Sequence, residues 1–513
     1  MPALKSETIA AVDVGSNSLR MKIVEVKGNG KLTTLEDLRK TINLGRDSFA
    51  HGIIRTDTVI ATCNILKDFH KVMREYRVKS YRAVSTSAIR EAENRDYILD
   101  QIKIKTGLEI EVINNSQERY LTYKAIRDRM DNYAELRKQG LLILDIGAGG
   151  VETSLYKDGF LNFTENVKIG SLRLREILYE LERRTLNFPE IMEQFVESKI
   201  YLLRPLIEEK KLKNYICLGG ELKVISVLCG HKVDGVQKIS MQEVNELYAV
   251  LKGMTTQGIV QKYGISTERV EVLLPSLIIL KKFFEVVKTE YLFAPLVSLR
   301  DGLIADIADE RFQLKRRADF IEDVIYSVRQ LGRKYNYDEK HSRQVERLAL
   351  SIFDQTKKLH AFGERERFYL QIAAILHDVG KFIGLNGHDT NSYNIIYYSD
   401  IMGLSDRDRS IVSNIAGYHS EDEPDMRHDK YRNLSYEDRL IVSKLCSILM
   451  LADSLDISHK QSIKKLEVEI DDALNIKVET DSDIVLEQWV FENKIEFFHK
   501  VYGIRPIVKK RGR

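Results

Sequence analysis

Two short segments of the chain, residues 9–21 and 142–153, share one order of residue types. Each has an apolar run, an acid, one apolar residue, a glycine, a turn of small residues and then alternating polar and apolar residues. The two acids are Asp13 and Asp145. A strand, a small-residue turn and a returning strand can wrap backbone N–H groups around a phosphate, and the acid before the turn is placed to hold a cation. The two hairpins therefore predict a cleft for a phosphorylated ligand and a metal ion.

The turns of these hairpins supply most of the expected phosphate contacts. Gly15 and Gly147 have no Cβ, so the backbone can approach a ligand closely. Arg90 follows a short strand and a run of hydroxyl residues at 85–87, where its guanidinium either binds two phosphate oxygens or forms a surface salt bridge. The residues predicted to bind phosphate are Gly15, Ser16, Asn17, Ser18, Arg90, Gly147, Ala148, Gly149 and Gly150.

Two further acids belong to the same prediction. Glu118 lies just inside the start of a helix, where it either complements the helix dipole or acts as a general base on water. Glu152 lies on the returning strand of the second hairpin and can hold the same ion as Asp145 through water, as Mg²⁺ prefers. We therefore predict that Asp13, Asp145 and Glu152 lie around a Mg²⁺ ion.

A second set of candidate ligands lies in the last third of the chain. His341, the adjacent His377 and Asp378, and Asp453 lie in or beside apolar helical segments. This set resembles the HD phosphohydrolase superfamily, in which a His, a His-Asp pair and a distant Asp bind one divalent metal. Imidazole and carboxylate suit Mn²⁺, Fe²⁺ or Zn²⁺. The alternative is an ancestral constellation that now only packs.

Two more histidines, His388 and His419, lie between these ligands in the sequence. They are candidates for a second metal ion in the same region.

The elements that must position these residues change along the chain. A β-hairpin followed by alternating helices and strands, with helical spacing at 57–76, predicts an α/β unit with a mixed sheet. The pattern starts again near residue 141, and the apolar segment 270–284 predicts a buried helix. From about residue 310 glycines become rare and helical periodicity predicts an all-α region. Alternation at 466–470 and 474–478 then predicts strands in a small cap.

Composition limits the class of protein. The 513 residues carry a formal net charge of +3 with 43% hydrophobic and 30% charged residues, which is typical of a globular protein and gives no basic field for nucleic acid. The four cysteines are scattered, without a CxxC pair, which favours a reducing cytosol. The sequence shows no signal-peptide pattern and no apolar run near the roughly 20 residues that a membrane span needs. We therefore expect a cytoplasmic protein of several domains.

The hairpins and the segments between them resemble the exopolyphosphatase / guanosine pentaphosphate phosphohydrolase family. The similarity lies in residues 12–18, 85–94, 145–152 and 299–302, in the family's order. Together with the HD resemblance it implies an α/β protein with two ribonuclease-H-like domains of the actin-like ATPase fold, then an all-α HD-like domain and a small α+β cap. The expected domains are residues 1–121, 122–304, 305–460 and 461–513.

The resemblance also implies an activity and roles for residues. It implies Mg²⁺-dependent release of terminal orthophosphate from inorganic polyphosphate, with Glu118 as the catalytic base, and it favours a homodimer. The alternatives are a guanosine pentaphosphate 5′-phosphohydrolase and a non-catalytic regulator that binds an alarmone or nucleotide.

This chain departs from the family pattern at several positions. Gln117 replaces an acid beside the expected base, and Arg119 replaces a small residue. Ala148 and Val151 interrupt the second turn, and Glu221 adds a carboxylate that would repel a polyanion if it faced the cleft. These changes bear on substrate choice and rate.

Overall fold

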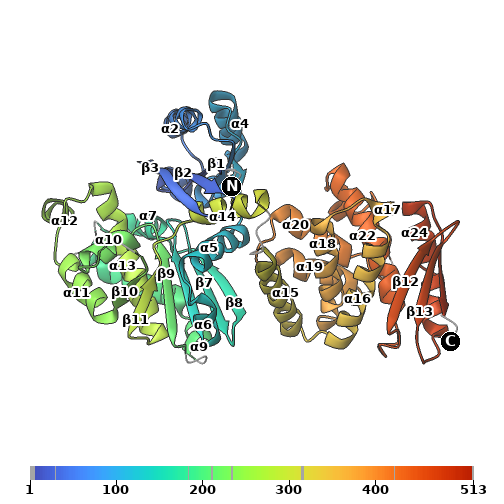
Figure 1. Cartoon of the computed structure of the whole chain (residues 1–513). Helices are drawn as coiled ribbons and strands as arrows, with labels where there is room; N and C mark the ends of the chain where they lie inside the picture. Colours follow the sequence, from blue (N-terminus) through green and yellow to red (C-terminus); the bar gives the residue numbers. More distant parts are fainter. Residues whose placement is uncertain are drawn as a thin grey trace. The chain divides into compact units, whose positions relative to one another are not determined.

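The chain divides into two compact units, Met1–Asp323 and Val324–Arg513, which are described separately (Figure 1). The computed structural model describes residues 6–28, 30–182, 184–185, 187–208, 212–232, 235–312, 317–420 and 422–510, with the backbone alone at 317–320. The N-terminal unit is built on two mixed sheets, and the C-terminal unit is mainly helical. This arrangement agrees with the expected change of character near residue 310.

The first lobe of the N-terminal unit contains a five-stranded sheet in the order β3-β2-β1-β4-β5. Its central strand β1 pairs antiparallel with β2 and parallel with β4, which makes the sheet mixed. Helix α2 (Thr56–Glu75) covers part of it and buries Val59, Cys63 and Leu66 at helical spacing, so the predicted helix is confirmed. The strands are β1 (Ser6–Val14), β2 (Ser18–Lys27), β3 (Leu32–Thr41), β4 (Ser80–Ser85) and β5 (Glu111–Val112). The other helices are α1 (Leu44–His51), α3 (Ser87–Glu91), α4 (Arg95–Thr106) and α5 (Asn115–Arg129), and the next helix, α6 (Tyr133–Lys138), packs against strands of the second lobe.

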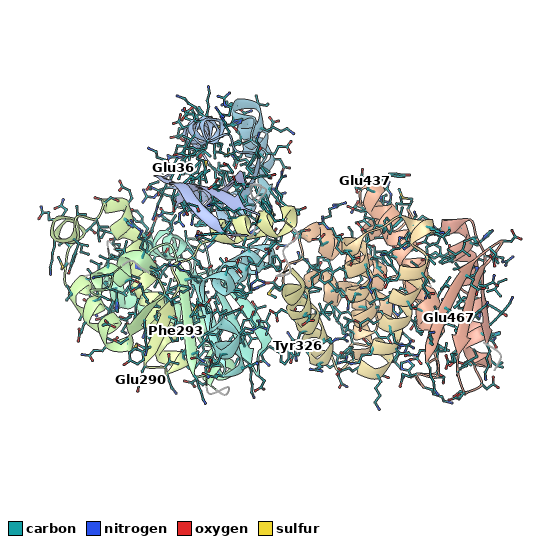
Figure 2. All side chains as sticks on the ribbon, in the orientation of Figure 1. Glu36, Glu290, Phe293, Tyr326, Glu437 and Glu467 are labelled. Atoms are coloured by element: carbon teal, nitrogen blue, oxygen red, sulfur yellow. The ribbon has the colours of Figure 1, made fainter. Side chains whose placement is uncertain are left out.

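The second lobe repeats the strand plan in a six-stranded sheet of order β10-β11-β9-β6-β7-β8. Here β6 pairs antiparallel with β7 and parallel with β9, as β1 does with β2 and β4. Phe293 of β11, labelled in Figure 2, pairs with Ile216 of β9 and Lys238 of β10. The strands are β6 (Leu141–Ile146), β7 (Val151–Lys157), β8 (Phe160–Val167), β9 (Asn214–Gly219), β10 (Gln237–Ser240) and β11 (Tyr291–Ala294).

Helices of the second lobe pack around one apolar helix. This helix, α13 (Thr267–Val287), buries most of its length and contacts β6, which confirms the buried helix predicted at 270–284. The other helices are α7 (Ser171–Glu182), α8 (Phe188–Ile200), α9 (Arg204–Glu208), α10 (Leu222–Leu228), α11 (Met241–Lys252) and α12 (Thr256–Tyr263).

After the second lobe the chain returns to the first. Helix α14 (Leu299–Arg311) packs against β1 and α5, where Leu303 and Ile304 join Ile9 and Leu121 in one apolar cluster. The closest approach is at Gly302, because a Cβ there would lie 2.0 Å from the Leu121 carbonyl oxygen. The expected domain boundaries stay predictions, and α14 ties the end of the second lobe to the sheet that carries Asp13.

The C-terminal unit combines a helical body with a small sheet. The sheet has the order β12-β13-β14, with β13 antiparallel to β12 and parallel to β14, so the two predicted strands are confirmed. Among the described residues, none of the helices is long and apolar enough to span a bilayer. The helices are α15 (Arg317–Lys334), α16 (Glu339–Gln355), α17 (Lys357–His360), α18 (Glu364–Leu376), the 3-10 helix η1 (Val379–Phe382), α19 (His388–Tyr398), α20 (Asp406–Ala416), α21 (Asp429–Arg432), α22 (Tyr436–Ser454), α23 (Val485–Glu492) and α24 (Ile495–Tyr502). The strands are β12 (Lys465–Ile470), β13 (Leu474–Glu479) and β14 (Pro506–Lys510).

The contact between α14 and α5 can be tested at Gly302. We expect Gly302→Ala to lower the free energy of unfolding by about 1–3 kcal/mol, because the new methyl group overlaps backbone atoms that cannot rotate away. Gly253→Ala is the matched control, since its nearest atom, the Val250 carbonyl oxygen, lies 3.8 Å from the added Cβ. Chemical denaturation of the two variants measures the difference. Equal stability of the two variants would show that α14 moves away from α5 without a cost in the free energy of unfolding.

Candidate active site

The two hairpins have the same turn geometry. The Gly15 N–H donates to the Ser18 carbonyl at 3.2 Å, and the Gly147 N–H donates to the Gly150 carbonyl at 3.0 Å. The strand registers also correspond, because Asp13 lies opposite Arg20 and Asp145 lies opposite Glu152. Opposite residues of an antiparallel pair project from the same face of the sheet. Each acid therefore has one charged neighbour, positive in the first hairpin and negative in the second.

The hairpins line one cavity of about 940 Å³ in the N-terminal unit. Every residue predicted for phosphate binding, for the Mg²⁺ ion or as the base lies on its wall, and their roles stay predictions. They are Asp13, Gly15, Ser16, Asn17, Ser18, Arg90, Glu118, Asp145, Gly147, Ala148, Gly149, Gly150 and Glu152.

The first and second turns approach each other closely at Ser87. Its hydroxyl lies 2.9 Å from that of Ser16, and a Cβ on Gly149 would come within 2.4 Å of the Ser87 Oγ. Only glycine fits at position 149 without a displacement of Ser87. The departure Val151, by contrast, is fully buried on β7 in the core of the second lobe. Val151 therefore acts on packing of the second turn and offers no group to a ligand.

Helix α5 positions Glu118 at the cavity. Its N-terminus is fixed by a capping box, in which Asn114 accepts from the Gln117 N–H at 3.0 Å and Gln117 accepts from the Asn114 N–H. Gln117 also donates to Glu111 and is not on the cavity wall, whereas Glu118 is. The departure at Gln117 thus removes no carboxylate from the cavity.

Arg90 holds the carboxylate of Glu118 from one side. The ion pair measures 3.7 Å, and Arg90 is fixed by donating to the Ile113 carbonyl at 2.6 Å and to Asn115 at 2.5 Å. Burial raises the pKa of Glu118, and Arg90 opposes that shift. The pairing keeps a carboxylate available beside the predicted phosphate contacts.

Asp13 and Asp145 are the carboxylates of the cavity that a bound cation would stabilise most. Removal from water and the nearby charge of Glu118 raise the pKa of Asp145 to about 7. Burial also raises the pKa of Asp13, against the pull of Arg20, and its Oδ1 has no hydrogen-bond partner. Within the part of the chain that is described, the Asp145 carboxylate makes no hydrogen bond or ion pair. An oxygen-liganded cation would satisfy both groups.

Glu152 has a partner that sequence reasoning did not foresee. Arg119, whose side chain is fully buried, donates to Glu152 at 3.0 Å, and Asn166 donates to the other carboxylate oxygen. The departure at Arg119 therefore neutralises one of the acids predicted around the Mg²⁺ ion. Glu152 as a direct ligand stays a prediction, and it would compete with this pair.

Glu221 faces the cavity but is not a free negative charge. Arg269 donates to it at 2.8 Å and Arg39 at 3.3 Å. Arg20 and Arg300 lie on the same wall of the cavity. Sequence analysis did not predict these four arginines, because they come from strands and helices far apart in the sequence. Arg20 could have been predicted from its spacing, since it follows Asp13 by the same number of residues by which Glu152 follows Asp145. Arg39 and Arg269 thus neutralise Glu221, so this carboxylate does not act as the free repelling charge that the sequence suggested.

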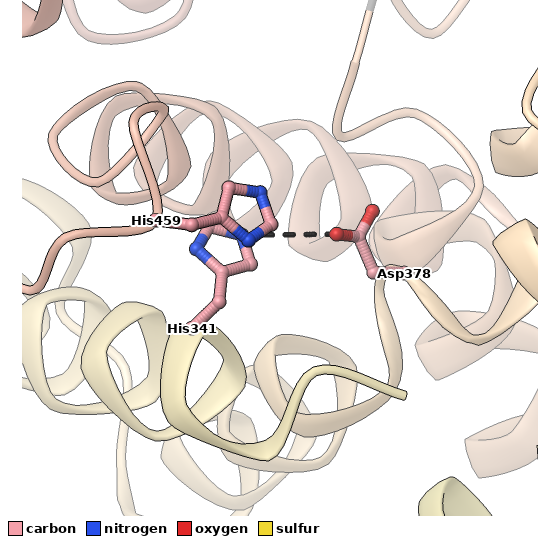
Figure 3. Close-up of side chains that lie close together, drawn as sticks. All are labelled: His341, Asp378 and His459. Carbon is pink, nitrogen blue, oxygen red and sulfur yellow. Dashed lines mark ion pairs between the residues drawn. The ribbon is translucent and has the colours of Figure 1, made fainter. Parts of the chain in front are cut away.

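The predicted ligands of the last third of the chain also come together, in the C-terminal unit. His341 lies on α16, His377 follows α18, and Asp453 lies on α22. The His341 Nε2 lies 3.2 Å from Asp453 and 3.3 Å from the His377 Nε2. Figure 3 shows the pair of His341 with Asp378, which measures 3.7 Å. Four side chains from two helices and one loop therefore converge.

His388 and His419 reach the same cluster from its other side. Their Nε2 atoms lie 3.2 Å apart and within 3.6 and 3.4 Å of Asp378 Oδ1. Two neighbours were missed by sequence reasoning: Asp456 accepts from the His341 Nδ1 at 2.9 Å, and His459 stacks on the His341 ring (Figure 3). Both residues could have been predicted as neighbours of the cluster, because they lie close to Asp453 in the sequence. Like the cluster, both lie within the C-terminal unit.

Comparison with known proteins assigns the family. The model of the Ppx/GppA phosphatase family matches residues 23–311, and that of Ppx/GppA phosphatase domain III matches residues 325–495. The chain belongs to the Ppx/GppA phosphatase family. Members are hydrolases that act on phosphoanhydride bonds and generally depend on a divalent metal.

Individual relatives are distant. A bifunctional 3-dehydroquinate synthase/phosphatase of Fusobacterium nucleatum is 26% identical over 317 residues, and the match covers 58% of this chain and 46% of that protein. A guanosine-5′-triphosphate,3′-diphosphate pyrophosphatase of Vibrio vulnificus is 23% identical over 81% of both chains. An exopolyphosphatase structure from Cytophaga hutchinsonii, 19% identical, matches with a TM-score of 0.53 over 59% of this chain and 98% of that chain. The structural neighbours of this family have the actin-like ATPase fold.

The buried pair of Arg119 and Glu152 gives a test of the cavity wall. We expect Arg119→Ala to lower the free energy of unfolding by about 3 kcal/mol or more, because it removes the cation that pairs with the buried Glu152 carboxylate. Arg119→Ala with Glu152→Ala should cost less than the sum of the two single changes. Equilibrium denaturation of the four proteins measures this coupling. Strict additivity would contradict the pair.

Proposed function

We propose that the N-terminal unit is a Mg²⁺-dependent exopolyphosphatase that releases orthophosphate from the end of inorganic polyphosphate. The observation that carries the proposal is the single cavity in which both glycine turns, Arg90 and Glu118 face one another. Donors on both sides and a carboxylate near them are what hydrolysis of a terminal phosphoryl group requires.

The residues present fit a Mg²⁺ ion. Asp145 lacks a partner among the described residues, and the Oδ1 of Asp13 is buried without one, so both would gain an interaction from an oxygen-liganded cation. When bound, the ion would neutralise negative charge on the phosphate oxygens. Asp145 and Asp13 would hold it, with Glu152 reached through water if Arg119 keeps its place.

The chain's own residues would carry the reaction as follows. The N–H groups of the turns at Gly15–Ser18 and Gly147–Gly150, with Arg90, bind the oxygens of the terminal phosphoryl group. Glu118 accepts a proton from a water molecule at one carboxylate oxygen, and the water oxygen attacks the phosphorus in line. The bond to the bridging oxygen breaks, and the rest of the polymer leaves.

The second candidate substrate is guanosine pentaphosphate. The match to a protein named as its pyrophosphatase over 81% of both chains favours this reading. Phosphate release from long-chain polyphosphate and from guanosine pentaphosphate, each with and without Mg²⁺, separates the two. Release from neither would leave a binding protein without catalysis. A homodimer and a cytoplasmic location stay predictions, of which light scattering tests the first.

The role of Glu118 can be tested directly. We expect Glu118→Gln to keep polyphosphate binding and to lower phosphate release by a factor of about 10² to 10⁴, because the amide cannot accept the proton. Glu75→Gln, at an exposed position on α2, is the control and should match the wild type. Turnover of Glu118→Gln within a few-fold of the wild type would exclude it as the base.

We propose further that the C-terminal unit is an HD-type domain whose His341, His377, Asp378 and Asp453 hold a transition metal. The convergence of their nitrogen and oxygen atoms supports this. Inductively coupled plasma mass spectrometry of untagged protein, purified without chelator, tests it. The metal should be lost in His377→Ala and kept in His499→Ala, which changes an exposed histidine of α24. A metal-free wild type would favour a domain that only packs.

A further inference from the structure

The carboxylate of Glu221 holds one arginine on each of its oxygens. Arg39 of β3 donates from Nη2 to Oε1 at 3.3 Å, and Arg269 of α13 donates from Nε to Oε2 at 2.8 Å. Strand β3 belongs to the first lobe and α13 to the second, so cations from both lobes meet at one carboxylate. One negative charge cannot neutralise two guanidinium groups, and the cluster of Glu221, Arg39 and Arg269 therefore keeps a net positive charge.

The two arginines keep donors for a further anion. Each spends one of its five side-chain N–H donors on Glu221, and no other side-chain hydrogen bond of either arginine occurs within the described part of the chain. The side chains of Arg39 and Arg269 are 28% and 31% exposed, whereas that of Glu221 is 5% exposed. A ligand in the cavity can therefore reach the guanidinium groups, whose planar fork fits two phosphate oxygens.

The glycine before Glu221 brings the cluster close to the first turn. A Cβ on Gly220 would lie 2.9 Å from Nη2 of Arg20, so the backbone there packs directly on that arginine. The Nε of Arg20 in turn donates to the Ser18 hydroxyl of the first turn at 3.0 Å. On the other side, the end of β9 pairs with the end of β6, which leads into the second turn. The cluster thus lies beside both turns, on the wall of the same cavity.

We propose that Glu221 is an internal anion that occupies a phosphate subsite of this cavity and thereby sets its affinity for polyanions. Phosphate groups behind the terminal one bind Arg39 and Arg269 after they displace the Glu221 carboxylate. This role rests on the proposed function for the identity of the anion. It adds to that function a subsite whose three residues take no part in the proposed binding of the terminal phosphoryl group or in its hydrolysis.

Only the side chain of Glu221 is free to move when a ligand arrives. Its backbone begins α10, where the Glu221 carbonyl accepts from the N–H groups of Val224 and Ile225 at 2.9 and 3.0 Å. A displaced carboxylate therefore stays near the bound polyanion and repels it. Glu221 lowers the affinity in two ways, because it competes for the arginines and remains as a like charge after it has left them. The subsite selects for ligands with enough negative charge to overcome both effects.

The competing interpretation is that Glu221 only braces the two lobes. Such a brace exists elsewhere, since Arg46 of α1 pairs with Glu176 of α7 at 3.2 Å, and Glu176 is not on the cavity wall. A brace predicts that removal of the carboxylate changes stability without any gain in anion binding. Glu176→Gln is thus a matched control for Glu221→Gln, because each removes one carboxylate that joins the lobes.

Anion binding without turnover tests the subsite. We expect the full-length Glu221→Gln protein to bind sodium tripolyphosphate in EDTA about 10-fold more tightly than the wild type, since a hydrogen bond to a charged group contributes at least this factor. Glu176→Gln should bind like the wild type. Isothermal titration calorimetry measures the dissociation constants, and circular dichroism with the thermal midpoint establishes that each variant is folded. Unchanged or weaker binding by Glu221→Gln would overturn the proposal.

Removal of the arginines separates competition from simple repulsion. The gain of Glu221→Gln should disappear when Arg39→Ala and Arg269→Ala are added, because the freed donors are then absent. A gain that persists in this triple variant would mean that Glu221 only repels the ligand and does not occupy a subsite. Absence of tripolyphosphate binding by every protein would also contradict the subsite.

Kinetics with Mg²⁺ and long-chain polyphosphate tests where the subsite acts. Glu221→Gln should lower KM and leave kcat within about twofold of the wild type, since a contact made equally before and during the reaction changes KM alone. A fall in kcat at unchanged KM would instead assign Glu221 to the positioning of the reacting groups. If no protein releases phosphate, the proposed reaction fails, while the tripolyphosphate affinities still decide the role of Glu221.

Discussion

A buried carboxylate needs a positive partner, and this constraint organises the cavity of the N-terminal unit. Glu152 is paired with Arg119, and Glu221 with Arg269 and Arg39. Asp145 is left, among the described residues, without a hydrogen bond or an ion pair, although the charge of Glu118 is close enough to raise its pKa. The place that best suits a cation is therefore defined by the carboxylate that the protein itself does not neutralise.

The same constraint makes the two hairpins unequal. Their turns are closed by the same hydrogen bond and their strands have the same register, so the backbone is repeated. The residue opposite the acid differs: Arg20 in the first hairpin and Glu152 in the second. The first hairpin carries its own positive charge near the turn and suits a phosphate. In the second hairpin Arg119 pairs with Glu152, and Asp145 is the carboxylate that is left to suit a cation. Under the proposed function, one backbone device would serve the two ends of a phosphate-metal complex.

How much of this was predictable depends on the range of the interactions. The hairpins, the buried helix α13 and the strands β12 and β13 follow from local patterns, and the sequence identified them. The partner of Glu152 is an arginine on another element, and the partners of Glu221 come from β3 and α13. No local pattern encodes such pairs. Local sequence patterns also do not predict that α14 packs against the first lobe, because this packing depends on the contact of Gly302 with Leu121.

In the C-terminal cluster, local structure does determine part of the candidate site. His377, His388 and His419 each bond through Nδ1 to the carbonyl of the residue three positions earlier. A single turn of chain therefore fixes the tautomer of each ring and leaves Nε2 facing the cluster. What the sequence could not show is that Asp378 turns one oxygen toward each pair of rings, because this depends on the packing of four helices. The orientation of each ring is set by local contacts, and the assembly of the cluster depends on tertiary packing.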